Sequence, residues 1–520
     1  MRSVFIISDL HLGGAYPDPP TAGARGFRLC TRADAIAQFV AERTAAIADS
    51  GPSEIVLNGD TVDFLAECDR PPPAAATWSS FTADPQAAAE KFKSIVRRDR
   101  QVFEALSAYL DAGGRLTVLL GNHDIELSLP AIRDALRTAL GVKAHHDFEF
   151  LFDGEAYIVG DALIEHGNRY DAWNQVDYDA LRHVRSFQSR RLPIPEDYAF
   201  GPPPGSDMVT TVINPIKVDY PFIDLLKPET EAVVPMLLAL EPGFRAQIGK
   251  VAMLLARSRR HGLRDAVTPR LGSDISANSP LRALEGDNLA AGAYRGGLGG
   301  DIATGGPAEQ PPRADAEQAL KLTLSAALGS ENAAAFLRDI DSQVAAIDPL
   351  AAISTDISAG ETVRRVFGFA ALLFGRSSKP YTTRLPALLE AIRALQNTQA
   401  FDQDKETATE YLNAATDLAA KGGFRYVVFG HTHLAKRVPL ANGGLYLNSG
   451  TWADVLRFPA ETFRSESEAL TALETFVDHM KSGDFSPYTV FTPTYVHLQV
   501  GTDGKVASAE LLPFTARSAQ

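Results

Sequence analysis

Imidazole, carboxylate and amide side chains recur in short polar clusters along this chain of 520 residues, and each cluster directly follows an apolar run. Imidazole nitrogen and carboxylate oxygen are the usual ligands of divalent first-row metals, and a site for two metals needs a carboxylate able to bridge them. The clusters contain seven candidate ligands, which are Asp9, His11, Asp60, Asn122, His166, His431 and His433. The residue types therefore predict a centre for two divalent ions.

The spacing within the clusters supports this prediction. Asp9 and His11 are two residues apart, as are His431 and His433, and such residues project to the same side if strand geometry persists. Asp60 follows Gly59, which lets the chain turn sharply and suits a bridging carboxylate. A lone histidine could equally be a hydrogen-bonded core residue, so the prediction depends on the conjunction: five of the eleven histidines lie in these clusters.

The segments that must position these clusters alternate between strand and helix patterns, which indicates an α/β architecture. Apolar runs predict strands before the five clusters at 4–8, 54–57, 116–120, 163–165 and 426–429. Helical periodicity predicts helices at 33–49, 85–112 and 130–140. Further strands at 148–152 and 156–159 are expected to form a hairpin about Asp153-Gly154, and 488–500 is expected to pair with 506–513.

The domain organisation follows from a change of character in the middle of the chain. Residues 1–170 and 423–520 are predicted to form one discontinuous α/β domain. Residues 171–422 are predicted to be a mostly helical insert, or cap, with a Gly-, Ala- and Pro-rich flexible stretch at 265–316. An amphipathic segment at 233–255 could contact a membrane or an acyl chain, or pack inside the cap.

Composition narrows the class of protein. With 50 Lys and Arg against 64 Asp and Glu, the net charge of -14 argues against a sequence-independent nucleic-acid binder, which normally carries a basic surface. Two cysteines give no disulfide framework, which favours a reducing compartment. The first apolar run leads straight into Asp9, unlike a signal peptide, and no apolar stretch reaches the roughly eighteen residues of a membrane span. We therefore expect a cytoplasmic protein without a transmembrane segment.

The order of the clusters resembles that of the calcineurin-like metallophosphoesterase superfamily. The matching motifs are Asp9-x-His11, Gly59-Asp60, Gly121-Asn122-His123-Asp124, His166-Gly167 and Gly430-His431-Thr432-His433, and the resemblance covers about 1–170 and 423–515. It implies a four-layer α/β/β/α sandwich with a dinuclear site at the strand ends. By position in the motifs, one metal would be held by Asp9, His11, Asp60 and His433. The other would be held by Asp60, Asn122, His166 and His431.

The resemblance also implies a metal-dependent phosphoric ester hydrolase. A hydroxide that bridges the two ions would attack the phosphorus of a phosphomonoester, phosphodiester or pyrophosphate. His123 would face the phosphate and could protonate the leaving oxygen, while Asp124 could orient the His123 imidazole. Asp171 and Trp173, which follow the His166 cluster, could line the pocket or simply pack.

Two stretches, 8–13 and 59–64, look most like the UDP-2,3-diacylglucosamine pyrophosphohydrolases, which are manganese-dependent, cytoplasmic and membrane-associated. This implies Mn²⁺, with Fe or Zn as the other candidate metals, and a small-molecule or lipid-linked phosphate ester as substrate, with peripheral contact to a membrane. His123 and Asn168 stand where that family typically carries Arg and an acidic residue, so other phosphoesters stay open. Two alternatives also remain, a catalytically silent scaffold that binds a partner through the cap, and a nuclease.

Overall fold

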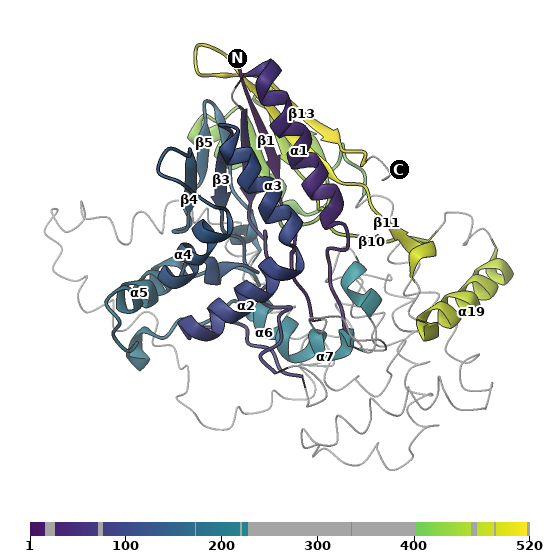
Figure 1. The fold of residues 1–520 in the computed structure, drawn as a ribbon. Coiled ribbons are helices and arrows are strands. Elements are labelled where there is room, and N and C mark those ends of the chain that lie inside the picture. The colour runs from purple at the N-terminus through teal and green to yellow at the C-terminus, as the bar shows by residue number, and fades with distance from the viewer. Residues whose placement is uncertain are drawn as a thin grey trace, which may run out of the picture.

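The structure is a computed structural model that describes residues 1–15, 26–51, 53–70, 76–171, 173–218, 221–226, 334, 401–458, 465–482 and 485–516. This part of the chain is a mixed α/β structure with two large sheets and a short two-stranded ribbon, as predicted at the level of fold class (Figure 1). The segments 233–255 and 265–316 lie outside the described residues. Among the helices that the structure describes, none is long and apolar enough to span a bilayer.

The larger sheet has six strands in the order β13-β12-β1-β2-β3-β4. Its strands are β1 (Arg2–Ile7), β2 (Ser53–Asn58), β3 (Arg115–Leu119), β4 (Phe148–Leu151), β12 (Thr494–Val500) and β13 (Val506–Pro513). The first four run parallel, whereas β12 is antiparallel to β1 and forms the predicted hairpin with β13. Because β1 lies between β12 and β2, both ends of the chain contribute to one sheet.

The smaller sheet has five strands in the order β5-β6-β7-β9-β8. They are β5 (Tyr157–Val159), β6 (Ala162–Ile164), β7 (Tyr426–Phe429), β8 (Lys436–Pro439) and β9 (Leu445–Asn448), and the ribbon pairs β10 (Val455–Leu456) with β11 (Thr489–Val490). Strands β6, β7 and β9 are parallel. Their carboxyl ends therefore meet at one edge of the sheet, as do those of β1, β2 and β3 in the larger sheet.

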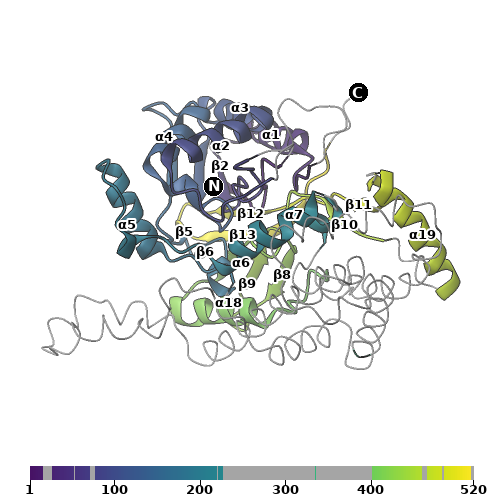
Figure 2. The same ribbon diagram turned by 90° about the horizontal axis from the view of Figure 1, so that it is seen from below.

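Helices cover the outer faces of the two sheets. The bounds are α1 (Ala33–Ser50), α2 (Pro85–Arg98), α3 (Arg100–Asp111), α4 (Pro130–Ala139), α5 (Tyr178–Ser189), α6 (Pro204–Met208), α7 (Asn214–Lys217), α18 (Thr409–Gly422) and α19 (Glu466–Ser482). Figure 2 shows α1 to α4 on one side of the molecule and α18 on the opposite side, with the strands between them. The described parts of segment 171–422 contain α5, α6, α7 and α18, and the domain boundaries at 170 and 423 stay predictions.

Apolar side chains gather in three main clusters that match this arrangement. One lies between α1 to α4 and the outer face of the larger sheet. A second joins the inner faces of the two sheets, with Val4 and Ile6 from β1 and Ile164 and Val428 from β6 and β7. The third packs α18 against the smaller sheet. The two sheets are thus fixed face to face, which sets the distance between their strand ends.

The single helix predicted at 85–112 is instead two helices that meet at Asp99, which has φ -109° and ψ 31°. The Asp99 carboxylate is buried and accepts hydrogen bonds from the Gly13 N–H at 2.8 Å and from the Arg28 guanidinium at 2.5 Å. Helical periodicity continues across the break, so the sequence pattern alone does not reveal it. The break places a carboxylate against the loop that follows His11.

The hairpin predicted about Asp153-Gly154 is wrong. β4 pairs parallel with β3 in the larger sheet, whereas β5 pairs antiparallel with β6 in the smaller one, so the chain crosses between the sheets here. The physical reason is burial: Phe148 and Phe150 pack with the helix-side cluster, whereas Val159 belongs to the cluster between the sheets. The hairpin of this region lies one strand later, where Gly160 adopts a φ of 61°.

Candidate metal centre

The five polar clusters converge in the structure. Three overlapping groups have potential ligand atoms within 4.8 Å of one another: Asp9 with His11 and His433, His11 with Asp60 and His123, and Asp60 with His166 and His431. Asp60 and His11 each belong to two groups, which joins all three into one centre. The structure therefore brings together six of the seven predicted ligands by these distances alone.

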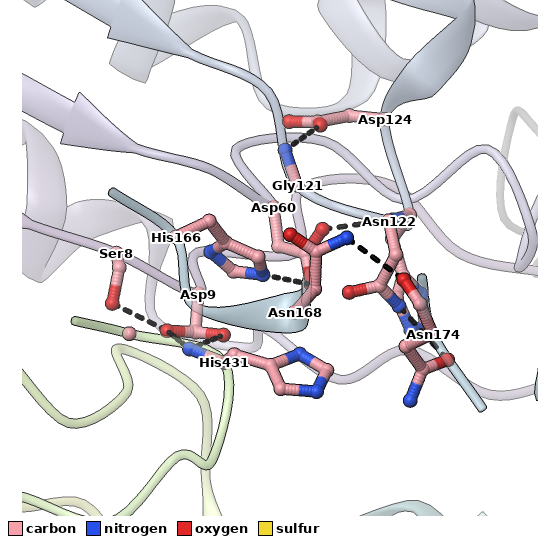
Figure 3. A network of polar contacts seen from close by, with 12 residues as sticks. Ser8, Asp9, Asp60, Gly121, Asn122, Asp124, His166, Asn168, Asn174 and His431 are labelled. Atoms are coloured by element: carbon pink, nitrogen blue, oxygen red, sulfur yellow. Dashed lines mark hydrogen bonds and ion pairs between the residues drawn. The ribbon is translucent and has the colours of Figure 1, made fainter. Parts of the chain in front are cut away.

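Asn122, the seventh, lies beside Asp60 (Figure 3). The backbone N–H of His123, the next residue, donates to Oδ1 of Asp60 at 2.8 Å. On the other side, a Cβ at Gly121 would lie 2.6 Å from Cγ of Asp60. Asn122 is thus held between two residues that both abut the shared carboxylate.

Strand geometry does not persist through the ligand pairs, which corrects the reasoning from their spacing. β1 ends at Ile7, and the φ angles of Asp9 and His11 are 55° and 45°. Asp60, His431 and His433 also have positive φ, so five of the six non-glycine residues with positive φ in the described chain are predicted ligands. L residues avoid this region, and such outliers persist only where surrounding structure enforces them, often at functional sites.

Hydrogen bonds between the loops enforce this backbone. The N–H groups of Asp9 and His11 donate to the carbonyls of Gly59 and Asp60, at 3.2 and 2.9 Å. The N–H of His431 donates to the Asp9 carboxylate at 3.0 Å. Each ligand loop therefore holds another, and the strained turns are stabilised by contacts between strand ends.

Two glycines allow the close approach of ligands from different strands. Gly59 has a φ of 82°, and a Cβ there would lie 2.5 Å from the ring of His166. A Cβ at Gly121 would lie 2.5 Å from the backbone nitrogen of Asp60, although Gly121 itself has no positive φ. Gly59 thus provides the predicted turn and also leaves room for His166, whereas Gly121 only leaves room for Asp60.

The hydrogen bonds of the histidine rings determine which nitrogen faces the centre. Nδ1 of His166 donates to the carbonyl of Asn58 at 2.8 Å, and its Nε2 lies 3.1 Å from Oδ2 of Asp60. Nδ1 of His11 lies 3.4 Å from Oδ2 of Asp63, which leaves its Nε2 only 3.0 Å from Nε2 of His433. Metal-binding histidines show this pattern, in which one nitrogen is held by an oxygen and the other binds the ion.

The donor atoms fit divalent cations. Oδ1 of Asn122 is buried and has no hydrogen-bond partner. Leaving a buried polar atom unsatisfied costs about 1–3 kcal/mol, so a cation beside this oxygen would remove a real penalty. The set as a whole offers imidazole nitrogen, carboxylate oxygen and one amide oxygen, the mixture that first-row divalent metals accept.

The expectation that Asp124 orients the His123 imidazole is wrong. The two oxygens of Asp124 accept hydrogen bonds from the backbone N–H groups of Gly121 and Thr61, at 2.7 and 2.8 Å, and Figure 3 shows its carboxylate on the Gly121 backbone. Nδ1 of His123 instead lies 3.1 Å from Oδ1 of Asp63. Asp124 therefore ties the two loops together, and Asp63 is the carboxylate that holds the ring.

Mutual electrostatics favour the ionised form of Asp60 and Asp63, whereas burial raises the pKa of Asp9. Burial opposes ionisation of Asp60, but the nearby His166 and His123 outweigh it and hold the pKa of Asp60 well below its usual range. Burial likewise opposes ionisation of Asp63, and His123 and His11 lower its pKa. Burial would lower the pKa of His166, yet Asp60 raises it to about 10. A cation that binds His166 must displace this proton, so metal binding should release protons.

Reasoning from the sequence missed Asp63, although it lies only three residues after Asp60. Its side chain also accepts the Ala66 N–H at 3.0 Å, a local turn that the sequence could suggest without linking it to a histidine. Of the two residues left open after His166, Asp171 contacts the centre, with Oδ2 3.1 Å from Nε2 of His431. Trp173 is buried at 7% exposure, which fits packing.

Comparison of the chain with protein-family models, curated protein sequences and solved structures found no match.

Proposed function

We propose that this protein is a phosphoric ester hydrolase that uses two divalent metal ions. Asp9, His11, Asp60 and His433 would hold one ion, and Asp60, Asn122, His166 and His431 the other. When bound, two such ions supply Lewis acidity toward phosphate oxygens and a water of lowered pKa. The observation that carries the proposal is that the two ligand groups, Asp9 with His11 and His433 and Asp60 with His166 and His431, converge from separate strand ends.

The fold supports the same proposal at a finer level. The apolar clusters on the helix side, between the sheets and under α18 are those expected of a four-layer α/β/β/α sandwich. We propose that this sandwich is that of the calcineurin-like metallophosphoesterases. The ligand loops follow β1, β2, β3, β6 and β7, and binding sites in parallel sheets typically lie at such carboxyl ends.

His123 is the residue best suited to act on the substrate. Its side chain is 19% exposed, whereas those of Asp60 and His166 are 2% and 1% exposed. With Nδ1 held by Asp63, Nε2 is the atom that can donate to a phosphate oxygen or to the leaving oxygen. The Asp63 carboxylate stabilises the positive charge that the ring carries when protonated, so the pair functions as a hydrogen-bond donor or acid.

The substrate class follows from the chemistry of the centre. Phosphomonoesters, phosphodiesters and pyrophosphates all present anionic oxygens to two cations, and a lipid-linked pyrophosphate is included among them. Mn²⁺ is the proposed metal, with Fe and Zn as the other metals that imidazole and carboxylate accept. Cys30 and Cys68 form no disulfide, which supports the cytoplasm as the proposed location.

The test is a hydrolysis screen of the full-length protein loaded with Mn²⁺. Bis-p-nitrophenyl phosphate, p-nitrophenyl phosphate, a UDP-sugar pyrophosphate and single-stranded DNA are each offered, and at least one of the first three should be hydrolysed. The variant His123→Asn should lower turnover by about 10²–10⁴-fold while Mn²⁺ content is unchanged. His145→Asn is the matched control, because His145 is exposed and belongs to none of the ligand groups.

Three results would count against the proposal. Full Mn²⁺ content with no hydrolysis of any substrate would favour the silent scaffold. Hydrolysis of DNA alone would favour the nuclease. A wild-type protein that binds no divalent metal would remove the proposed centre itself.

A further inference from the structure

Asp171 and Asn174 lie against the metal centre although they belong to none of the ligand motifs. Oδ2 of Asp171 lies 3.1 Å from Nε2 of His431 and also accepts a hydrogen bond from Nδ2 of Asn174 at 2.7 Å. Oδ1 of Asp171 accepts the backbone N–H of Trp173 at 2.9 Å. Both oxygens of this carboxylate are thus used, and one of them holds a predicted metal ligand.

Asn174 contacts the other side of the same ligand set. Its Oδ1 accepts a hydrogen bond from Nδ2 of Asn122 at 3.4 Å, and its backbone carbonyl accepts one from Nδ2 of Asn168 at 2.8 Å (Figure 3). The backbone next to Asn174 is itself held in place, since the Gly205 N–H at the start of α6 donates to the carbonyl of Trp173 at 2.9 Å. Asp171 and Asn174 therefore form one connected unit.

These contacts determine which atoms of two ligands remain for a cation. Because Nδ2 of Asn122 points to Asn174, its amide is oriented with Oδ1 as the buried atom that has no hydrogen-bond partner. Because Nε2 of His431 is held by Asp171, Nδ1 is the ring nitrogen left to bind. An amide without such a contact could turn its NH₂ group inward and repel a cation, and a ring without one could rotate.

We propose that Asp171 and Asn174 are positioning residues for the second metal position, the one formed by Asp60, Asn122, His166 and His431. This inference rests on the proposed dinuclear function. Asp171 contacts His431 and Asn174 contacts Asn122, and these two ligands belong to the second position and not to the first, which is formed by Asp9, His11, Asp60 and His433. Loss of Asp171 or Asn174 should therefore weaken one ion and spare the other.

The experiment measures Mn²⁺ binding to the full chain by equilibrium dialysis, together with electron paramagnetic resonance of the bound ions. Two neighbouring Mn²⁺ ions give an exchange-coupled spectrum, whereas a single bound ion gives the spectrum of an isolated centre. In Asp171→Ala and in Asn174→Ala, the affinity for one ion should fall by about 10–100-fold, and the coupled signal should give way to that of isolated Mn²⁺. Asp171→Asn keeps one acceptor oxygen for His431 and should fall between these variants and the wild type.

The matched control is Asp177→Ala, three residues after Asn174. Asp177 caps α5 by accepting the Ala180 N–H at 2.9 Å, so its loss should lower stability by about 1 kcal/mol. A purely structural role for Asp171 predicts that Asp171→Ala and Asp177→Ala behave alike, with lower stability and two coupled Mn²⁺ ions. Circular dichroism of each variant verifies that it is folded.

The outcomes separate this inference from the proposed function. Unchanged binding of both ions in folded Asp171→Ala and Asn174→Ala, or equal weakening of both ions, overturns the inference and leaves the hydrolase intact. If Asp171→Ala and Asn174→Ala each lose one ion selectively, but the wild type hydrolyses no phosphoester, the inference is supported and the hydrolase is overturned. A wild type that binds no Mn²⁺ overturns both.

Discussion

Glu126 is a buried carboxyl group just beyond the Gly121–Asp124 loop, and its surroundings make a quantitative prediction. Oε1 accepts the Thr82 N–H at 2.7 Å, while Oε2 is buried without a hydrogen-bond partner. Burial raises the pKa of Glu126 to about 7, and the hydrogen bond from Thr82 offsets only part of this rise. The nearby Lys91 ammonium is engaged 2.7 Å from Asp69, so it does not neutralise Glu126 directly.

The sign of the effect follows from linkage. The folded protein binds the Glu126 proton more tightly than the unfolded chain, in which the pKa is near 4.5. The free energy of unfolding therefore decreases as pH rises from about 4.5 to 7, and the full penalty remains above pH 7. A rise in pKa from 4.5 to about 7 corresponds to about 3 kcal/mol.

Glu126→Gln removes this charge while keeping the size of the side chain and the acceptor for Thr82. We expect the variant and the wild type to be equally stable at about pH 4.5, because protonated Glu and Gln are nearly isosteric. At about pH 8 the variant should be more stable by about 3 kcal/mol. Urea unfolding followed by tryptophan fluorescence across this range gives the difference directly, and the contributions of other titrating groups cancel.

A difference in stability that stays constant from pH 4.5 to 8 would refute the reasoning, because no other property of Gln varies with pH in this window. A variant that becomes less stable than the wild type as pH rises would show that the Glu126 carboxylate makes a favourable contact when charged. Either result would also mean that the Thr82 N–H and Lys91 compensate for burial.

Two further predictions concern the centre. Gly121→Ala should lower the free energy of unfolding by about 1–3 kcal/mol and abolish binding of Mn²⁺, because the new Cβ meets Asp60. Gly201→Ala, whose Cβ would face open space, should change neither quantity. Calorimetry measures the stability of each variant, and dialysis measures its Mn²⁺ binding. Mn²⁺ at about 100 times its Kd should stabilise the wild type by about 3 kcal/mol per ion over protein held in EDTA, and Asp60→Asn should lose most of that gain. A wild-type melting temperature that is the same with Mn²⁺ as with EDTA would contradict the second prediction.

The parts of the fold that could be predicted are those in which burial is nearly complete. All six residues of β2 and all four of β7 are buried, and each strand contains an apolar run, at 55–57 in β2 and over the whole of β7. β8 was not predicted, because its buried positions include Lys436, whose ammonium donates to the carbonyls of Asp402 and Lys405. Hydropathy places a lysine outside, and only the tertiary structure supplies the acceptors that let it be buried.

Which sheet a strand joins was likewise beyond the sequence. Phe148–Leu151 and Tyr157–Val159 are short strands joined by a Gly-containing turn, which is the local signature of a hairpin. The two strands join different sheets because one is covered by helices and the other by the opposing sheet. Those helices and that sheet are contributed by distant segments of the chain. Local pattern therefore predicted the strands and failed on their pairing.

The convergence of the candidate ligands could be predicted because chemistry restricts the types of residue that bind metals, whereas the carboxylates that contact the histidine rings could not. Asp63 and Asp171 have no distinguishing residue type or spacing, and they are recognised only when the structure places their oxygens 3.1 Å from His123 and His431. Asp124 illustrates the converse error. Adjacency in sequence suggested a contact with His123, but the loop turns the two side chains apart and gives Asp124 to backbone N–H groups.

The backbone of three ligand loops, those that follow β1, β2 and β7, gives the strongest physical argument that the centre binds a ligand. A left-handed conformation costs an L residue about 1–2 kcal/mol, and Asp9, His11, Asp60, His431 and His433 all adopt it. Their combined cost, roughly 5–10 kcal/mol, is comparable with the net stability of a whole domain. Packing alone would not require it, since each loop could relax if its side chain pointed outward. The strained backbone instead brings nitrogen and oxygen atoms within 4.8 Å of one another before any cation binds, so that binding need not order the loops.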